Sequence, residues 1–251
     1  MKDLLVANEK CWPYMWKSPT IEIEDDIEAP YIILNPIEGC KPVSEGCFRC
    51  FAKKYNQVEN LVFYEDLEIP YRINSPKRIY VCTHADLFQK WVSFSFIDAL
   101  LEVIENTPQH RYYFLTRHVN RMEEYFKRYS EKKKIPSNVE LGVSIELDKY
   151  CWRADVLRKI DHEYFYVAAE PLLGQLDTIN LLNIRWLITA GEFGLNSRSS
   201  ALMWFEDLRK KCIKTGTHFI LKSLGNYLVS QGYKDKHLYN TYYGEVGNGY
   251  L

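Results

Sequence analysis

The chain has 251 residues, of which 47% are hydrophobic, so it is long enough to bury a large core and has the length of a single α/β barrel. Its formal net charge is −1, which excludes a global basic field of the kind that attracts nucleic acid. The N-terminus has no charged segment followed by an apolar one, and no apolar stretch approaches the roughly 20 residues of a membrane span. We therefore expect a cytoplasmic protein that has no signal peptide and no contact with a membrane.

Residues 1–30 combine aromatic residues and prolines with an acidic stretch, and we expect them to form an irregular N-terminal extension. After residue 30, short apolar runs alternate with longer amphipathic ones. The seven predicted strands are residues 31–34, 78–82, 111–115, 139–145, 164–168, 186–189 and 218–221. The four predicted helices are residues 94–106, 119–133, 150–160 and 201–215. Residues 230–251 are polar and rich in Tyr and Gly, which is typical of a C-terminal tail.

Apolar strands separated by helices are typical of a parallel sheet that is buried on both faces. Seven such units without a domain break predict an α/β fold, a full or partial (β/α) barrel of parallel strands over residues 31–229. A doubly wound open sheet is the alternative. Both folds build their sites at the carboxyl ends of the strands, so they agree on which residues should converge.

Three of the seven cysteines form the pattern C-x6-C-x2-C, at Cys40, Cys47 and Cys50. An odd number of cysteines with three of them clustered favours metal binding over disulfides. Three thiolates can hold three corners of a metal centre and leave the fourth position open, as catalytic centres require. Gly39 and Gly46 precede the first two cysteines, and we expect them to let the backbone approach the sulfur atoms, with positive φ where needed.

The other candidate ligands are scattered along the chain. We interpret the remaining cysteines as small core residues: Cys11, Cys82, Cys151 and Cys212. We interpret three histidines as structural: His84, His110 and His118. The basic run from Arg117 to Lys134 could contact nucleic acid, but the simpler interpretation is the solvated face of a helix.

Polar residues follow nearly every predicted strand. They include Thr83 and Asp86, Arg117, Ser144 and Glu146, Glu170, Glu192, and Lys222. In a parallel barrel these residues would gather on one rim together with the cysteine loop. The three glutamates of this set could bind a metal, transfer protons or hold a ligand.

The cysteine loop resembles the pattern N-P-x-x-G-C-x-x-x-S-x-G-C-x-x-C-[YF]-A of the three-Cys-motif phage proteins. Further blocks of that family resemble residues 78–88, 107–117, 141–146 (L-G-V-S-I-E), 170–174 (E-P-L-L-G), 190–194 and 221–225. The family is in turn similar to radical S-adenosylmethionine (SAM) enzymes, which carry a three-cysteine loop after the first strand of a TIM-type partial barrel. Their usual spacing is C-x3-C-x2-C, whereas the first gap here has six residues.

The resemblance implies that Cys40, Cys47 and Cys50 hold a 4Fe-4S cluster. The fourth iron would bind SAM, and the reduced cluster would cleave it to modify an unidentified substrate, with nucleic acid or a nucleotide among the candidates. The resemblance also implies roles for the rim residues. Thr83 or Asp86 would bind the SAM amino group, and Ser144 or Glu146 would bind the ribose hydroxyls. Arg117 and Lys222 would bind an anionic group, and Glu170 and Glu192 would serve in acid–base chemistry or orient the substrate.

Two other interpretations stay open. The cysteines and one more ligand could hold zinc, or a cluster, in a binding module without catalysis. The resemblance also implies a companion protein, often methyltransferase-like, with which such a protein would act.

Overall fold

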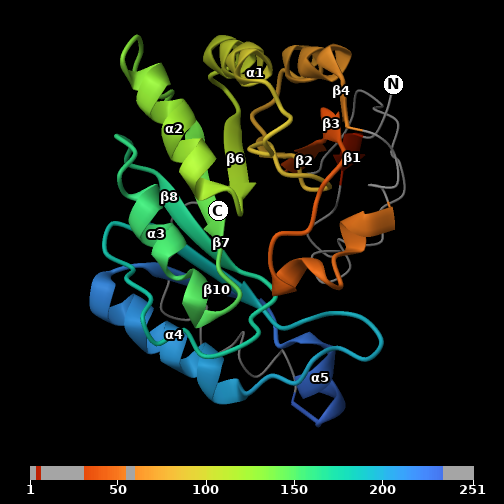
Figure 1. Ribbon diagram of the computed structural model, residues 1–251, viewed down its shortest axis with the longest axis vertical. Helices are drawn as coiled ribbons and strands as arrows, with labels where there is room; N and C mark the ends of the chain where they lie inside the picture. Colours follow the sequence, from red (N-terminus) through yellow and green to blue (C-terminus); the bar gives the residue numbers. More distant parts are fainter. Residues whose placement is uncertain (1–3, 7–30, 55–59, 234–251) are drawn as a thin grey trace. The chain divides into compact units, whose positions relative to one another are not determined.

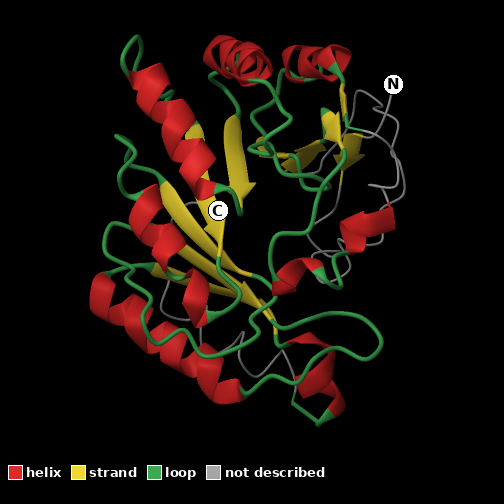
Figure 2. Ribbon diagram, in the orientation of Figure 1, coloured by secondary structure: helices red, strands yellow, loops and turns green. Residues whose placement is uncertain are grey.

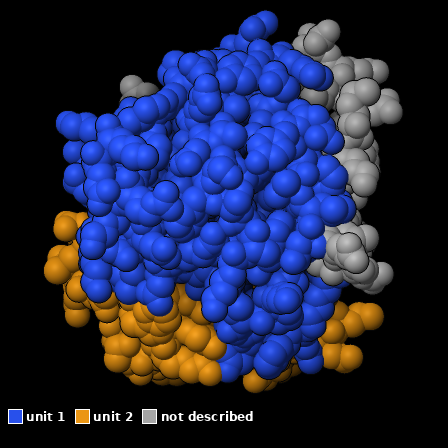
Figure 3. Space-filling model, turned by 45° about the horizontal axis from the view of Figure 1, so that its top comes forward, with its two compact units in different colours: residues 1–143, 156–164 blue, residues 144–155, 165–251 orange. Residues whose placement is uncertain are grey.

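The computed structural model describes residues 4–6, 31–54 and 60–233. The chain divides into two compact units (Figure 3), which we call unit 1 (residues 1–143 and 156–164) and unit 2 (residues 144–155 and 165–251). Strands and helices alternate along the sequence in both (Figure 2). The chain therefore has an α/β fold.

The sheet of unit 1 is built from β2 (Tyr31–Leu34), β5 (Arg78–Val81), β6 (Arg111–Thr116) and β7 (Val139–Ser144). These strands pair in that order, and each pair is parallel. A further strand, β1 (Leu4–Val6), pairs antiparallel with the other edge of β2. All four side chains of β2 are buried, whereas in β6 every second side chain is buried. Strands that are buried on both faces and strands that are buried on alternate residues therefore both occur in this sheet.

Two helices of unit 1 lie beside its sheet (Figure 1), α1 (Phe94–Asn106) and α2 (Val119–Ser130). Helix α1 begins where the Ser93 hydroxyl accepts a hydrogen bond from the backbone N–H of Phe96, at 3.2 Å. The hydroxyl of Tyr125 in α2 donates to Asp98 of α1 at 2.7 Å, which fastens the two helices together.

The cysteine segment of unit 1 consists of short elements. A two-stranded antiparallel sheet joins β3 (Ile37–Glu38) to β4 (Leu61–Val62). Among the described residues of the unit, the 3-10 helices are η2 (Glu45–Cys47), η3 (Phe51–Lys54), η4 (Tyr64–Glu68) and η5 (Pro70–Arg72).

Unit 2 has a parallel sheet in the order β8 (Phe165–Ala169), β9 (Trp186–Ala190) and β10 (His218–Ser223). Its helical elements are η6 (Asp148–Tyr150), the start of α3 (Trp152–Leu157), α4 (Leu202–Thr215) and α5 (Gly225–Ser230). Helix α4 ends at Gly216, which has a φ of 72° and donates its N–H to the carbonyl of Cys212.

All seven predicted strands are confirmed, with ends that differ by two residues or fewer, and so is the parallel α/β class. The predicted helix 94–106 is confirmed as α1, whereas the predicted helix 150–160 contains only the last residue of η6 and the shorter α3. Residues 4–6, within the expected irregular extension, form β1 and pair with β2. The rest of residues 1–30 and the tail beyond residue 233 lie outside the described residues. A single barrel over residues 31–229 stays a prediction.

Candidate functional site

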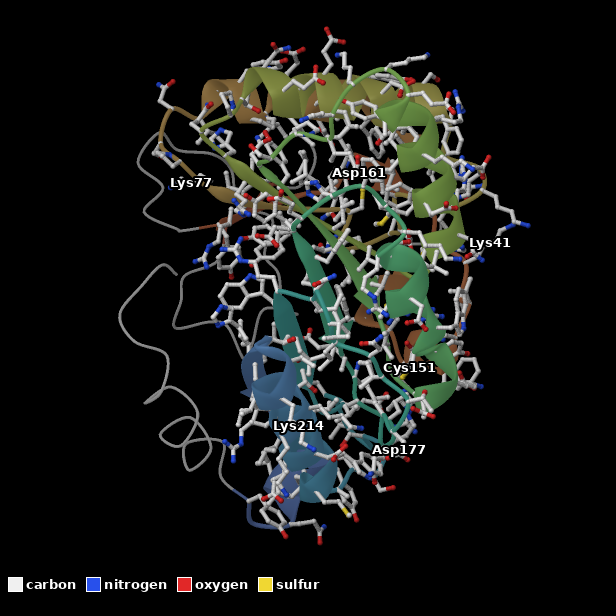
Figure 4. The ribbon with its side chains drawn as sticks, turned by 90° about the vertical axis from the view of Figure 1, so that its left-hand side faces the viewer. Lys41, Lys77, Cys151, Asp161, Asp177 and Lys214 are labelled. Atoms are coloured by element: carbon white, nitrogen blue, oxygen red, sulfur yellow. The ribbon has the colours of Figure 1, made fainter. Side chains whose placement is uncertain are left out.

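The cysteine loop follows β2 and β3 in unit 1. Gly39 has a φ of 99°, and a Cβ at this position would lie 2.6 Å from Oδ1 of Asn60, so both backbone and space require glycine. The expected positive φ is therefore confirmed for Gly39, whereas the approach of its backbone to a sulfur atom stays a prediction. Gly46 instead lies inside η2 (Glu45–Cys47). Lys41, labelled in Figure 4, is exposed.

The three thiols of the loop lie close enough to affect one another. Two successive turns hold them, with the N–H of Cys47 bonded to Ser44 O at 3.0 Å and the N–H of Cys50 to Cys47 O at 3.2 Å. Burial and then the nearby negative charges of Asp86, Cys47 and Cys50 raise the pKa of Cys40 to about 12. Burial also raises the pKa of Cys50, although Arg117 and Lys53 act in the opposite direction.

The thiols do not form a ready metal site. Within residues 4–6, 31–54 and 60–233, no three or more His, Cys, Asp or Glu side chains are grouped as metal ligands. The donor chemistry nevertheless fits a soft metal or an iron–sulfur cluster, because three sulfur atoms of one loop lie near each other. Burial raises the pKa of Cys40 and of Cys50, so a bound metal would have to displace the protons of these two thiols.

Asp86 joins the carboxyl ends of β5 and β6. Its Oδ1 accepts hydrogen bonds from the N–H of Phe88 at 3.0 Å and from the hydroxyl of Thr116 at 2.6 Å. Its Oδ2 accepts a bond from the N–H of Arg117 at 2.9 Å. The effect of Asp86 on the pKa of Cys40 shows that this carboxylate also lies near the cysteine loop.

Thr83 is connected to the end of β2 through Asn35. The Thr83 hydroxyl donates to Asn35 Oδ1 at 3.3 Å, and the backbone N–H of His84 donates to the same oxygen at 3.2 Å. Unit 1 therefore brings together four predicted features: the cysteine loop, Thr83, Asp86 and Arg117.

The sequence analysis missed two neighbours of Cys40. Cys82, interpreted as a core residue, is indeed buried, but burial and the charges of Asp86 and Cys40 raise the pKa of its thiol well above the usual value. It follows β5 with a φ of 59°, which is rare outside glycine. The second neighbour is Gln89, whose Nε2 donates to the Cys40 sulfur at 3.1 Å. Its sequence context gives no signal for such a contact.

The other cysteines agree with the core interpretation. Cys212 of α4 and Cys151 are 1% and 4% exposed. Burial raises the pKa of each to about 12. The Cys151 thiol, labelled in Figure 4, donates to Asp148 at 3.4 Å. Cys11 lies outside the described residues.

The predicted glutamates belong to unit 2, and each is paired with a cation. The ion pairs are Glu146–Arg153, Glu170–Lys222 and Glu192–Arg198. Glu146 is fully buried, and Arg153 also donates to the carbonyl of Ser144 at 2.7 Å. Glu170 and Lys222 are joined at 2.9 Å, and both side chains keep some exposure, 16% and 18%.

The carboxyl ends of β9 and β10 approach each other closely in unit 2. A Cβ on Gly191 would lie 2.1 Å from the carbonyl oxygen of Leu224, and one on Gly225 would lie 2.5 Å from the carbonyl carbon of Gly191. The N–H of Gly191 donates to Ser223 O at 2.9 Å. Two glycines thus set the distance between the strand ends that carry Glu192 and Lys222.

His110 and residues of the basic run make hydrogen bonds and an ion pair within unit 1. Arg121 donates to the carbonyls of Gln89 and Val92, and Lys133 pairs with Glu105 at 2.8 Å. His110 accepts a bond from the N–H of Lys77 at 3.2 Å and contacts Pro70 O through Nε2 at 3.1 Å. These contacts support the structural interpretation of His110 and of part of the basic run.

A model of the family described as protein of unknown function (DUF5131) matches residues 24–248. The chain therefore belongs to this family. No curated protein and no solved structure gives a significant match. Among the helices of the described residues, none combines the length and the apolar character that crossing a membrane would require.

Proposed function

We propose that this DUF5131 protein is an iron–sulfur enzyme of the radical-SAM type, in which Cys40, Cys47 and Cys50 hold a 4Fe-4S cluster. The observation that carries the proposal is the position of the cysteine loop beyond the carboxyl end of β2, where Cys40 interacts with Cys47, Cys50 and the Asp86 carboxylate that links β5 to β6. Sites of parallel α/β proteins form at this edge of the sheet. When bound, the reduced cluster would supply the electron that cleaves SAM.

Residues of unit 1 suit the binding of the cofactor. Burial raises the pKa of Cys50, and the positive charges of Arg117 and Lys53 oppose that rise, so they would help to balance the negative charge of a bound thiolate. Oδ2 of Asp86 accepts one bond from Arg117 N and has a further lone pair, which would hold the amino group of SAM. The Thr83 hydroxyl would assist there, and the Arg117 guanidinium would bind a carboxylate.

In unit 2 the Glu170–Lys222 pair is the best candidate for contact with the substrate. Oε1 of Glu170 is buried and has no hydrogen-bond partner among the described residues, while Oε2 accepts from Lys222. An oxygen in this condition would accept a substrate hydroxyl or a proton, and Lys222 would bind an anionic group. Glu192 is held by Arg198 at 3.0 Å and would orient the substrate.

Ser144 and Glu146, the candidates for binding the ribose hydroxyls, are both buried, at 1% and 0% exposure. Glu146 is 0% exposed and contacts Arg153 at 3.2 Å, so its role in the proposal is to hold the segment of Ser144 in place.

Anaerobic reconstitution with iron and sulfide tests the proposal. We expect a brown protein with about four irons and four sulfides per chain, the composition of a 4Fe-4S cluster, and cleavage of SAM to 5′-deoxyadenosine under reducing conditions. Cys40→Ala, Cys47→Ala and Cys50→Ala should each lose stoichiometric cluster binding. Cys212→Ala is the matched control, because this buried thiol lies in α4 of unit 2, and it should keep the cluster. If the protein with all three of these cysteines replaced by alanine still binds a full cluster, the proposal is refuted.

A closed metal site without catalysis is the second candidate, and Cys82 supports it. The Cys82 thiol interacts electrostatically with Cys40, so four sulfur atoms are available in unit 1. Four thiolates typically form a closed zinc site. Colourless protein containing zinc, with metal loss in Cys82→Ala, would favour this binding module and its action with a companion protein.

If nucleic acid is the substrate, its binding should weaken steeply with salt.

A further inference from the structure

The amide of Gln89 lies against the sulfur of Cys40. Gln89 is 3% exposed, and its Nε2 donates to Cys40 Sγ at 3.1 Å. A hydrogen bond to a cysteine sulfur withdraws electron density from it, and such bonds are among the factors that set the reduction potential of an iron–sulfur cluster. Gln89 therefore has a position from which it can act on the cluster without binding iron.

The segment that carries Gln89 is fixed from the side of α2. The Arg121 guanidinium donates through Nη1 to the carbonyl of Gln89 and through Nη2 to the carbonyl of Val92, at 2.6 Å. It also stacks on the ring of Phe94, 4.5 Å from the centroid. Within the segment, the N–H of Gln89 bonds to Asp86 O at 3.2 Å. Arg121, from the basic run of the sequence, thus supports a contact of the cysteine loop.

We infer that Gln89 is a positioning residue that raises the reduction potential of the cluster by donating a hydrogen bond to the Cys40 sulfur, and that Arg121 holds Gln89 in place. The inference rests on the proposed function. The one-electron reduction of the cluster adds negative charge, part of which resides on its sulfur ligands. A donor at that sulfur stabilises the reduced form more than the oxidised form.

A purely structural role of Gln89 predicts something different. A buried amide needs hydrogen-bond partners, so Gln89 could simply satisfy its own polar group. In that case its replacement would change the stability of unit 1 and leave the potential of the bound cluster where it was. The reduction potential therefore separates the two roles, whereas activity alone would not.

The experiment compares the reduction potentials of reconstituted variants in a titration followed by electron paramagnetic resonance. Gln89→Leu keeps the size of the side chain and removes the donor, so we expect full iron and sulfide content with a more negative potential. Gln89→Glu, which replaces the donor with a negative charge, should shift the potential further in the same direction. Arg121→Gln should give a smaller negative shift, because Gln89 keeps its amide but loses its support.

Two matched controls isolate the contact. Gln109→Leu removes an exposed glutamine of unit 1, whose amide donates to Ile73 O at 3.4 Å, and should leave the potential unchanged. Arg128→Gln removes the other arginine that stacks on Phe94, at 4.9 Å, and should also leave it unchanged.

An unchanged potential in Gln89→Leu overturns the inference and leaves the proposed function intact. If Gln89→Leu does not fold, Gln89→Glu decides in the same way. Failure of the unmodified protein to bind any cluster overturns both.

Discussion

Replacement of Asp86 should destabilise unit 1 by an amount that depends on how many of its hydrogen bonds survive. The carboxylate is 8% exposed and accepts three bonds, from Phe88 N, Thr116 Oγ1 and Arg117 N. A buried donor left without a partner costs about 1–3 kcal/mol. Asp86→Ala leaves three donors without their acceptor. Some of these donors would form hydrogen bonds with water instead, so we expect a loss of about 3–5 kcal/mol in the free energy of unfolding. Asp86→Asn keeps an oxygen for Phe88 and Thr116 and strands only the donor of Arg117, a loss of about 1–3 kcal/mol.

Urea denaturation followed by circular dichroism measures these losses. The matched control is Asp98→Asn, because within the described part of the chain Asp98 accepts one hydrogen bond, from the Tyr125 hydroxyl at 2.7 Å, and asparagine keeps an acceptor there. We expect this control to lose less than about 1 kcal/mol. The reasoning fails if Asp86→Asn is as stable as the unmodified protein, or if the two asparagine variants lose equal amounts.

Two further predictions concern pH and glycine. Burial lowers the pKa of His110 below its usual 6.5, so the neutral ring persists in the folded state while the unfolded chain takes up a proton as the pH falls through that value. Stability should therefore be complete above pH 6.5 and decline below it, with a shallower decline of the urea midpoint in His110→Gln; an equally steep decline in the variant would refute this. Gly225→Ala should cost more than about 2 kcal/mol, because its Cβ would meet the backbone of Gly191, whereas Gly232→Ala, also at positive φ but with nothing within 4 Å, should cost about 1 kcal/mol; equal thermal stability of the two variants would contradict the packing argument.

The alternation of apolar runs predicted the strands well because the parallel strands are buried. β2 and α1 have the bounds expected from the sequence, and β7 is buried along its whole length. Short elements were not predictable in this way. β3 and β4 have only two residues each and pair across a long loop, so no periodicity can develop in them. β1 has only three residues, which is too short a run for a strand period to develop.

The sequence predicts that polar residues following parallel strands converge. In unit 1 this rule identified part of the candidate site. Thr83, Asp86 and Arg117 follow strands. Thr83 donates to Asn35 at the end of β2, and the N–H of Arg117 donates to Asp86. The rule overlooked Cys82, because a cysteine at the end of an apolar run is indistinguishable from a core residue in the sequence. Gln89 was overlooked for a different reason. Its contact with Cys40 depends on the path of the segment that Arg121 holds, and that path is a tertiary property.

The three glutamates of unit 2 were equivalent in the sequence, and their partners distinguish them. Glu146 is fully buried with Arg153, so exchange of a proton with a ligand would require breaking a buried ion pair, which is costly. Glu192 receives the backbone N–H of Arg198 at 2.8 Å in addition to its guanidinium, so both carboxylate oxygens are engaged. Glu170 uses Oε2 for Lys222, while Oε1 lacks a hydrogen-bond partner among the described residues. Because proton transfer needs a lone pair that no other group occupies, Glu170 is the best candidate of the three for the acid–base role in the proposed enzyme.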